Sequence, residues 1–156
     1  MAFRLPKKCE VIFKELLESN NDVKLKLKFD AYYLCLLVGL SSKEIVNTPE
    51  YASSELVSEY PKEYYECRDY IAGLLLSTEA ERKIGENIES SELETIIKEL
   101  IKSDSPTRLT TAGEARLNEY AAKGSEIIQD KMMSHRFLDD FYLDYFECFE
   151  MNNFVM

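Results

Sequence analysis

Glycine and proline are scarce in this sequence, which holds 5 Gly and 4 Pro in 156 residues. An all-β domain with many tight turns uses more of both residues, and a few dispersed glycines cannot build a glycine-rich phosphate loop. Lysine, glutamate, leucine and alanine are frequent, and these residues favour helix. Hydrophobic residues make up 46% of the chain, enough for one folded core. We therefore predict an all-α fold, a single compact multi-helix domain over residues 1–156.

Long apolar runs are also absent. The longest, AYYLCLLVGL at residues 31–40, is far shorter than the roughly 20 residues that a transmembrane helix needs, and no secretory signal pattern is visible. Cysteines occur at Cys9, Cys35, Cys67 and Cys148 and form no Cys-x-x-Cys pair. We therefore expect a cytoplasmic location, no membrane contact, and reduced thiols that serve as small hydrophobic residues.

Catalytic and metal-binding patterns are missing as well. The single histidine, His135, has no Ser or Cys nucleophile at a recognisable spacing, and no His, Cys and carboxylate cluster has metal-ligand spacing. Asp139, Asp140 and Asp144 are near neighbours, but 29 acids in 156 residues produce such neighbours by composition alone. We interpret His135 as a surface or capping residue, and we expect no enzymatic activity, no cofactor and no metal.

Basic residues are too few to balance the acids. The chain has 19 Lys and Arg against 29 Asp and Glu, so its formal net charge is -10 and its pI about 4.7. A surface of this sign repels phosphate backbones and anionic lipid. The composition therefore disfavours direct nucleic-acid binding, and it suits a basic protein partner or a DNA-binding subunit of a larger assembly.

Hydrophobic spacing predicts helices at residues 6–19, 29–40, 62–86, 88–103 and 110–132. The helix at 29–40 is apolar nearly all round, which indicates that it is buried. Ser90 or Ser91 can cap the next-to-last of these helices, with Glu94 as the capping-box partner of Ser91. Residues 41–61 are rich in Ser, Thr, Asn and Pro, and we expect a loop-rich segment with a short helix inside it.

Residues 23–29, VKLKLKF, alternate strictly between apolar side chains and lysines. This period is typical of a strand, and the lysines would protect an exposed sheet edge. The same residues can also form an extended lead-in to the next helix. No convincing partner strand is visible, so we favour the lead-in and keep one short edge strand as the alternative.

The segment at 134–151 alternates acids and aromatics and predicts an amphipathic helix with an aromatic side and an acidic side. The aromatic side can pack on the protein's own domain, or it can enter a groove of a partner protein. We predict partner binding through aromatic anchors and acidic charge complements, because aromatic anchors dominate interfaces and rim charges steer encounter. The anchors are Phe141, Tyr142, Tyr145 and Phe149, and the charge complements are Asp140, Asp144 and Glu147.

RLTTAGEARL, residues 108–117, resembles the stretch near the wing of winged-helix regulators, where a strand ends in Leu-Thr and a helix begins. Thr110 or Thr111 would cap that helix, with Glu114 as a capping-box partner for Thr111. The resemblance implies a β-hairpin after residue 102 and operator binding. The preceding helix carries no arginine and more acids than lysines, which makes it a poor recognition helix.

A second resemblance covers most of residues 5–148. Its motifs are the PKKCEVIFKEL opening, the FDAYYLCLLVGL helix, RDYIAGLLLSTEAERK, the block from PTRLT to EII, and the closing FLDDFYLDYFE. The layout is similar to that of small helical proteins from bacterial DNA phosphorothioation gene clusters, the Dnd-system-associated proteins. This resemblance implies an accessory role beside DNA-modification or phage-defence machinery.

These observations favour a non-enzymatic accessory or adaptor protein that binds a larger protein subunit of such a system. A homodimer through a leftover aromatic face is a further expectation. Two alternatives stay open. One is an acidic DNA mimic that inhibits a DNA-binding protein, which needs acids along one long face. The other is the winged-helix regulator.

Overall fold

The computed structural model describes residues 3–18, 25–52, 56–85, 87–132, 135 and 137–149. These residues form seven α-helices and one 3₁₀ helix, so the all-α prediction is confirmed. The helices are α1 (Lys7–Ile12), α2 (Lys14–Glu18), α3 (Lys28–Ser42), η1 (Lys62–Cys67), α4 (Arg68–Lys83), α5 (Ser90–Leu100), α6 (Thr111–Lys131) and α7 (Leu138–Phe149). None of these described helices has both the length and the apolar character that a bilayer crossing requires.

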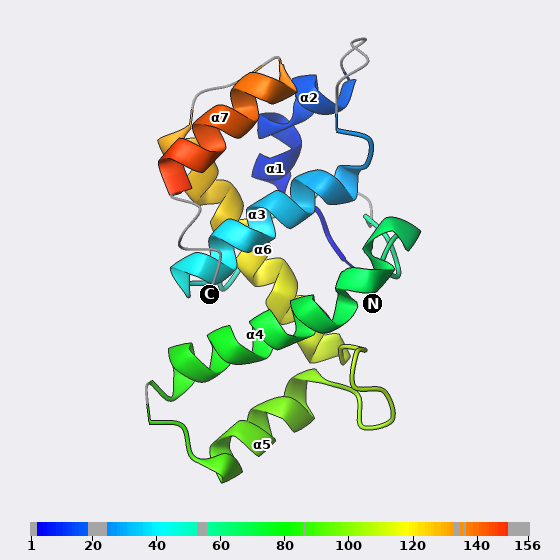
Figure 1. Cartoon of the computed structure of the whole chain (residues 1–156), viewed down its shortest axis with the longest axis vertical. Coiled ribbons are helices and arrows are strands. Elements are labelled where there is room, and N and C mark those ends of the chain that lie inside the picture. The colour runs from blue at the N-terminus through cyan, green and yellow to red at the C-terminus, as the bar shows by residue number, and fades with distance from the viewer. Residues whose placement is uncertain are drawn as a thin grey trace.

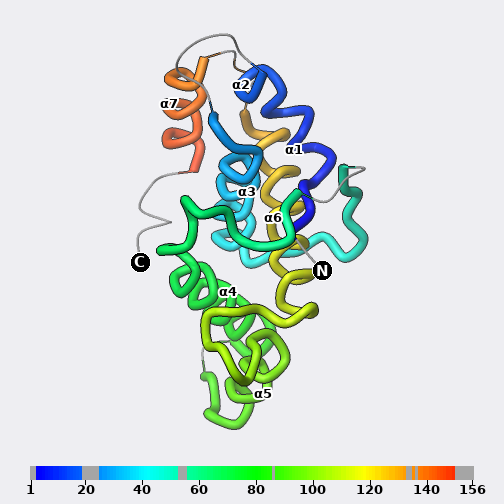
Figure 2. The backbone as a smooth tube through the Cα atoms, turned by 90° about the vertical axis from the view of Figure 1, so that its right-hand side faces the viewer, coloured from blue at the N-terminus to red at the C-terminus, as the bar shows by residue number. Residues whose placement is uncertain are grey.

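α6 is the longest helix and forms the axis of the molecule. Its C-terminal half packs against α1 and α3, and α4 and α5 lie beside its N-terminal half (Figure 1). α3 and α7 lie on one side of α6 and α1 on the other (Figure 2). Eight of the fifteen residues of α3 are buried, among them Phe29, Tyr32 and Leu36, as the largely apolar sequence predicts.

Two glycines allow α3 and α6 to cross with their backbones in contact. A Cβ atom built on Gly39 of α3 would lie 1.8 Å from the carbonyl oxygen of Tyr120, and one built on Gly124 of α6 would lie 1.7 Å from the carbonyl oxygen of Cys35. Any side chain at either position would therefore force the two helices apart. This crossing is the centre of the core.

The N-terminal segment pins the loop-rich segment in place. Residues 3–6 run antiparallel to residues 51–52 and 56–57 through the bridges Phe3–Val57 and Pro6–Tyr51, with hydrogen bonds such as Phe3 N to Val57 O at 3.0 Å. The described residues between α3 and η1 contain no helix, so the short helix that we predicted there is wrong for them. Hydrogen bonds with the distant N-terminal residues hold these residues in place.

Residues 25–27 form no strand and are followed directly by α3. The backbone of Leu27 is extended, with φ -123° and ψ 143°, and its N–H donates to the Asp30 carboxylate at 3.0 Å. The lead-in interpretation is therefore right for these residues and the edge strand is wrong; residues 23 and 24 lie outside the described residues. Asp30 also accepts a hydrogen bond from the hydroxyl of Tyr64 at 2.5 Å, which ties α3 to η1.

Candidate protein-docking surface

α7 begins with two acids, Asp139 and Asp140, in its first turn. Carboxylates are favourable there because the helix dipole is positive at its N-terminus. Its buried residues recur every four positions, at Phe141, Tyr145 and Phe149, which is the spacing of one helical face. The apolar stripe that makes α7 amphipathic is therefore also the side on which the helix is buried. The predicted bounds, 134–151, were wider than the observed helix, and residues 134, 136, 150 and 151 lie outside the described residues.

The aromatic stripe of α7 packs on the protein's own core. The ring of Phe141 lies edge-on to that of Phe13, with centroids 5.1 Å apart, and the hydroxyl of Tyr145 donates to the carbonyl oxygen of Leu34 at 2.9 Å. Phe141 and Tyr145 are each 2% exposed and Phe149 is 7% exposed. Our assignment of these three residues as partner anchors is therefore corrected: they are core residues.

Asp144 also has an internal role instead of the predicted role as a charge complement. Its carboxylate contacts Nε2 of His135 at 2.8 Å and accepts a hydrogen bond from Sγ of Cys148 at 3.2 Å. It is half-buried and links His135, three residues before α7, to the last turn of that helix. The histidine is thus not free on the surface: its ring and the Cys148 thiol contact the same carboxylate.

The opposite side of α7 is exposed and combines acids with large apolar side chains. We name this the outer face of α7, and its residues are Asp139, Asp140, Leu143, Phe146 and Glu147. Leu143 is 64% and Phe146 43% exposed. Leu143 lies at the centre, because the other four residues stand three or four positions from it and so surround it on the helix surface.

Tyr142 lies at the border between the two sides. It is half-buried, and its ring stacks on that of Phe146 with centroids 6.0 Å apart and planes 13° apart. Burial, aided by the charge of Asp30, raises the pKa of Tyr142, so its hydroxyl stays protonated and can donate a hydrogen bond. Of the four predicted aromatic anchors, Tyr142 is the one that a partner can reach.

Electrostatics favour a cationic ligand on this face. α7 contains no Lys or Arg, and the exposed acids Asp139, Asp140 and Glu147 make no ion pair with any described residue. Three uncompensated negative charges around an exposed leucine and phenylalanine match a segment that is both basic and apolar. Two of the predicted charge complements, Asp140 and Glu147, remain part of this surface.

Sequence reasoning missed Leu143 and Phe146. The prediction took the aromatic residues with helical spacing as the single apolar side of the helix. The other side of α7 also contains bulky apolar residues, and the prediction left these out. A signal was available: Leu143 has three acids three or four positions away, Asp139, Asp140 and Glu147, whereas in the buried stripe only Phe141 has one, Asp144. An apolar residue surrounded by carboxylates along a helix face indicates exposure.

A second cluster of charges, around Glu79, is internal. Glu79 is 0% exposed. It accepts hydrogen bonds from the Tyr120 hydroxyl at 2.5 Å and from Nε of Arg82 at 2.9 Å, and Arg116 lies 3.3 Å away. Burial alone would raise the pKa of Glu79, but these hydrogen bonds and the Arg116 charge lower it overall. The carboxylate is thus held ionised, and it joins α4 to α6 instead of facing a cleft.

No group of three or more His, Cys, Asp or Glu side chains within the described ranges is placed to hold a metal ion. All four cysteines are free, and the two buried ones, Cys9 and Cys35, lie with their sulfur atoms 3.5 Å apart.

Comparisons with protein-family models, with curated proteins and with solved structures find no match to this chain. The class defined by the fold is an acidic all-α protein with an exposed amphipathic helix face.

Proposed function

We propose that this protein is a non-enzymatic accessory factor that binds a larger protein through the outer face of α7. The observation that carries the proposal is the exposure of Leu143 and Phe146 on a helix without Lys or Arg, among three acids that make no ion pair with a described residue. Burial of such residues on association removes apolar surface from water, and the acids supply the charge complementarity. The expected partner surface is a groove or helix with lysines or arginines around an apolar centre.

The resemblance to Dnd-system-associated proteins suggests where the partner acts. Enzymes that modify or cut DNA carry positive surfaces for the phosphate backbone. An acidic adaptor of net charge -10 is suited to such an enzyme and is repelled by the DNA itself. We therefore propose a subunit of a bacterial DNA-modification or phage-defence assembly as the partner.

The test is affinity capture from the native host with three baits: the wild-type protein, Leu143→Asp and Val11→Asp. Val11 on α1 is 66% exposed, which matches Leu143, and it lies outside α7. The proposal expects a stoichiometric partner with the wild-type and Val11→Asp baits and its loss with Leu143→Asp. Equal recovery by all three baits would refute docking through the outer face of α7.

A second candidate function, DNA binding in the winged-helix manner, has one observation in its favour. The chain turns back between α5 and α6, with an antiparallel bridge between Ile101 and Leu109 and a hydrogen bond from Lys102 N to Arg108 O at 2.9 Å. Exposed acids on α5 weigh against it, because a recognition helix must approach phosphates. Nuclease treatment before capture separates the two functions: a protein partner survives it, and recovered DNA does not.

A further inference from the structure

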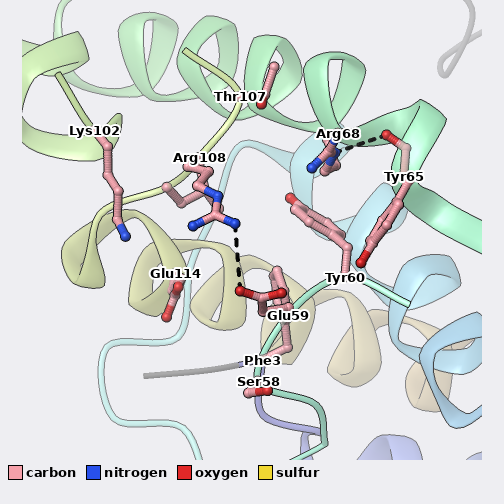
Figure 3. Close-up of a pocket in the computed structure, with 11 residues that line it drawn as sticks. Phe3, Ser58, Glu59, Tyr60, Tyr65, Arg68, Lys102, Thr107, Arg108 and Glu114 are labelled. Carbon is pink, nitrogen blue, oxygen red and sulfur yellow. Dashed lines mark hydrogen bonds and ion pairs between the residues drawn. The ribbon is translucent and has the colours of Figure 1, made fainter. Parts of the chain in front are cut away.

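A cavity of about 160 Å³ lies where four separate segments meet, and no residue of α7 is among those that line it (Figure 3). The segments are the N-terminal residues around Phe3, residues 58–60, the end of η1 with the start of α4, and the turn between α5 and α6 with the first turn of α6. Its size indicates a ligand smaller than drug-like molecules, whose pockets are commonly 300–1,000 Å³. The residues that line the cavity indicate the chemical class of that ligand.

Cations exceed acids in this cavity although the protein as a whole is strongly acidic. Arg68, Lys102 and Arg108 line it, against Glu59 and Glu114. Arg68 and Lys102 make no ion pair with a described residue, and Arg108 makes only a long one, 3.7 Å, with the exposed Glu59. Figure 3 shows Arg108 between the other two basic side chains. Three cations against two carboxylates leave the lining with a net positive charge, which favours an anionic ligand.

The hydroxyl of Tyr60 is a donor that finds no acceptor in the described part of the chain. It is buried and makes no hydrogen bond to any described residue, and it points toward the guanidinium of Arg68 (Figure 3). Burial, with the charge of Glu114, raises the pKa of Tyr60, so the hydroxyl keeps its proton. A buried unpaired hydroxyl is costly, and a ligand oxygen at this position would satisfy it.

The remaining wall of the cavity is apolar and aromatic. Phe3 and Leu109 are buried beside the rings of Tyr60 and Tyr65, and the Arg68 guanidinium lies over the Tyr65 ring at 4.8 Å. Flat ligands stack well on such rings. We propose that this cavity is a binding site for a small aromatic carboxylate, held by the basic side chains and the Tyr60 hydroxyl at its carboxylate and by the aromatic wall at its ring.

Benzoate, the neutral isostere benzamide, and inorganic phosphate are the probes for isothermal titration calorimetry on the full chain. The proposal expects saturable 1:1 binding of benzoate with a dissociation constant of about 1 mM or tighter. Benzamide should bind about tenfold more weakly, because it lacks the charge that strengthens the hydrogen bonds. Absence of saturable benzoate binding, equal affinity for benzamide, or binding of phosphate in place of benzoate would each overturn it.

Two variants locate the site. Tyr60→Phe removes a hydroxyl that has no described partner, so thermal stability should be unchanged or raised while benzoate binding weakens about threefold or more. Arg108→Gln should weaken binding about tenfold. Lys62→Gln, an exposed cation of η1 outside the lining, is the matched control and should leave the affinity unchanged. Benzoate binding that Tyr60→Phe and Arg108→Gln leave intact would place the ligand elsewhere and refute the assignment.

Discussion

The crossing of α3 and α6 predicts that Gly124→Ala destabilises the protein strongly. The new Cβ atom would lie 1.7 Å from the carbonyl oxygen of Cys35 and 2.9 Å from the backbone nitrogen of Gly39. Both are backbone atoms, which cannot rotate away as a flexible side chain can. The helices would therefore have to separate locally by roughly 1.5 Å to restore ordinary van der Waals contact.

The size of the effect follows from two opposing contributions. Overpacking of a tight core costs about 1–3 kcal/mol, and the rigid backbone contact places this site at the upper end. Alanine has a higher helix propensity than glycine by about 1 kcal/mol. We expect the free energy of unfolding of Gly124→Ala to fall by about 2 kcal/mol.

Gly73→Ala is the matched control, because Gly73 lies within α4 and a Cβ built on it meets no atom within 4 Å. It should raise the free energy of unfolding by about 0.5–1 kcal/mol. Denaturant unfolding followed by far-ultraviolet circular dichroism gives both values, provided that the slopes agree. The melting temperatures of the two variants should differ by about 6–12 °C. Equal stability of Gly124→Ala and Gly73→Ala would show that the two helices do not cross in backbone contact.

Three further predictions concern buried groups. The pKa of Glu79 is lowered on folding, so its stabilisation is present above its ordinary pKa and is lost as the pH falls; Glu79→Gln should lower stability at pH 7 and flatten the acid limb of a pH–stability curve. A curve of unchanged shape would contradict the ion cluster. Tyr145→Phe should cost about 1–2 kcal/mol in denaturant unfolding, because the Leu34 carbonyl loses its 2.9 Å hydrogen bond; no loss would contradict the docking of α7. Cys9 and Cys35 are 0% exposed, and burial raises the pKa of Cys9, so both should resist iodoacetamide in the native protein while the other two cysteines react. Mass spectrometry of the labelled peptides gives this order, and early labelling of Cys9 would refute it.

Local sequence patterns predict much of this fold. The apolar series of α3 predicts a buried helix, and the structure buries it. Thr110 was one of two predicted caps, and its hydroxyl accepts a hydrogen bond from Gly113 N at 3.0 Å. The Ser91 capping box is wrong, because α5 begins at Ser90 and the residue before it, Glu89, makes no side-chain cap. Glu89, Ser90 and Ser91 are consecutive at the start of α5, and composition alone does not choose between successive positions.

Features that depend on distant residues were not predictable from periodicity. The pairing of residues 3–6 with residues 51–52 and 56–57 joins segments that have no strand pattern of their own. Glu79 looks like any other acid in a helix, and its burial depends on cations and a tyrosine that the fold brings to it. In α7 both sides carry bulky apolar residues, so the pattern predicts an amphipathic helix without deciding which side the core takes.

The central claim is that the outer face of α7 binds a basic partner, and charge reversal tests it most directly. One bait carries Asp139→Lys, Asp140→Lys and Glu147→Lys. The control bait carries lysines at three exposed acids of η1 and α4 that make no described ion pair, Glu63, Glu66 and Asp69. Both baits have the same net charge, so any difference in partner recovery reports the surface and not the overall charge. Loss of the partner with the α7 bait alone is the predicted result, and equal recovery by the two baits would contradict the proposed function.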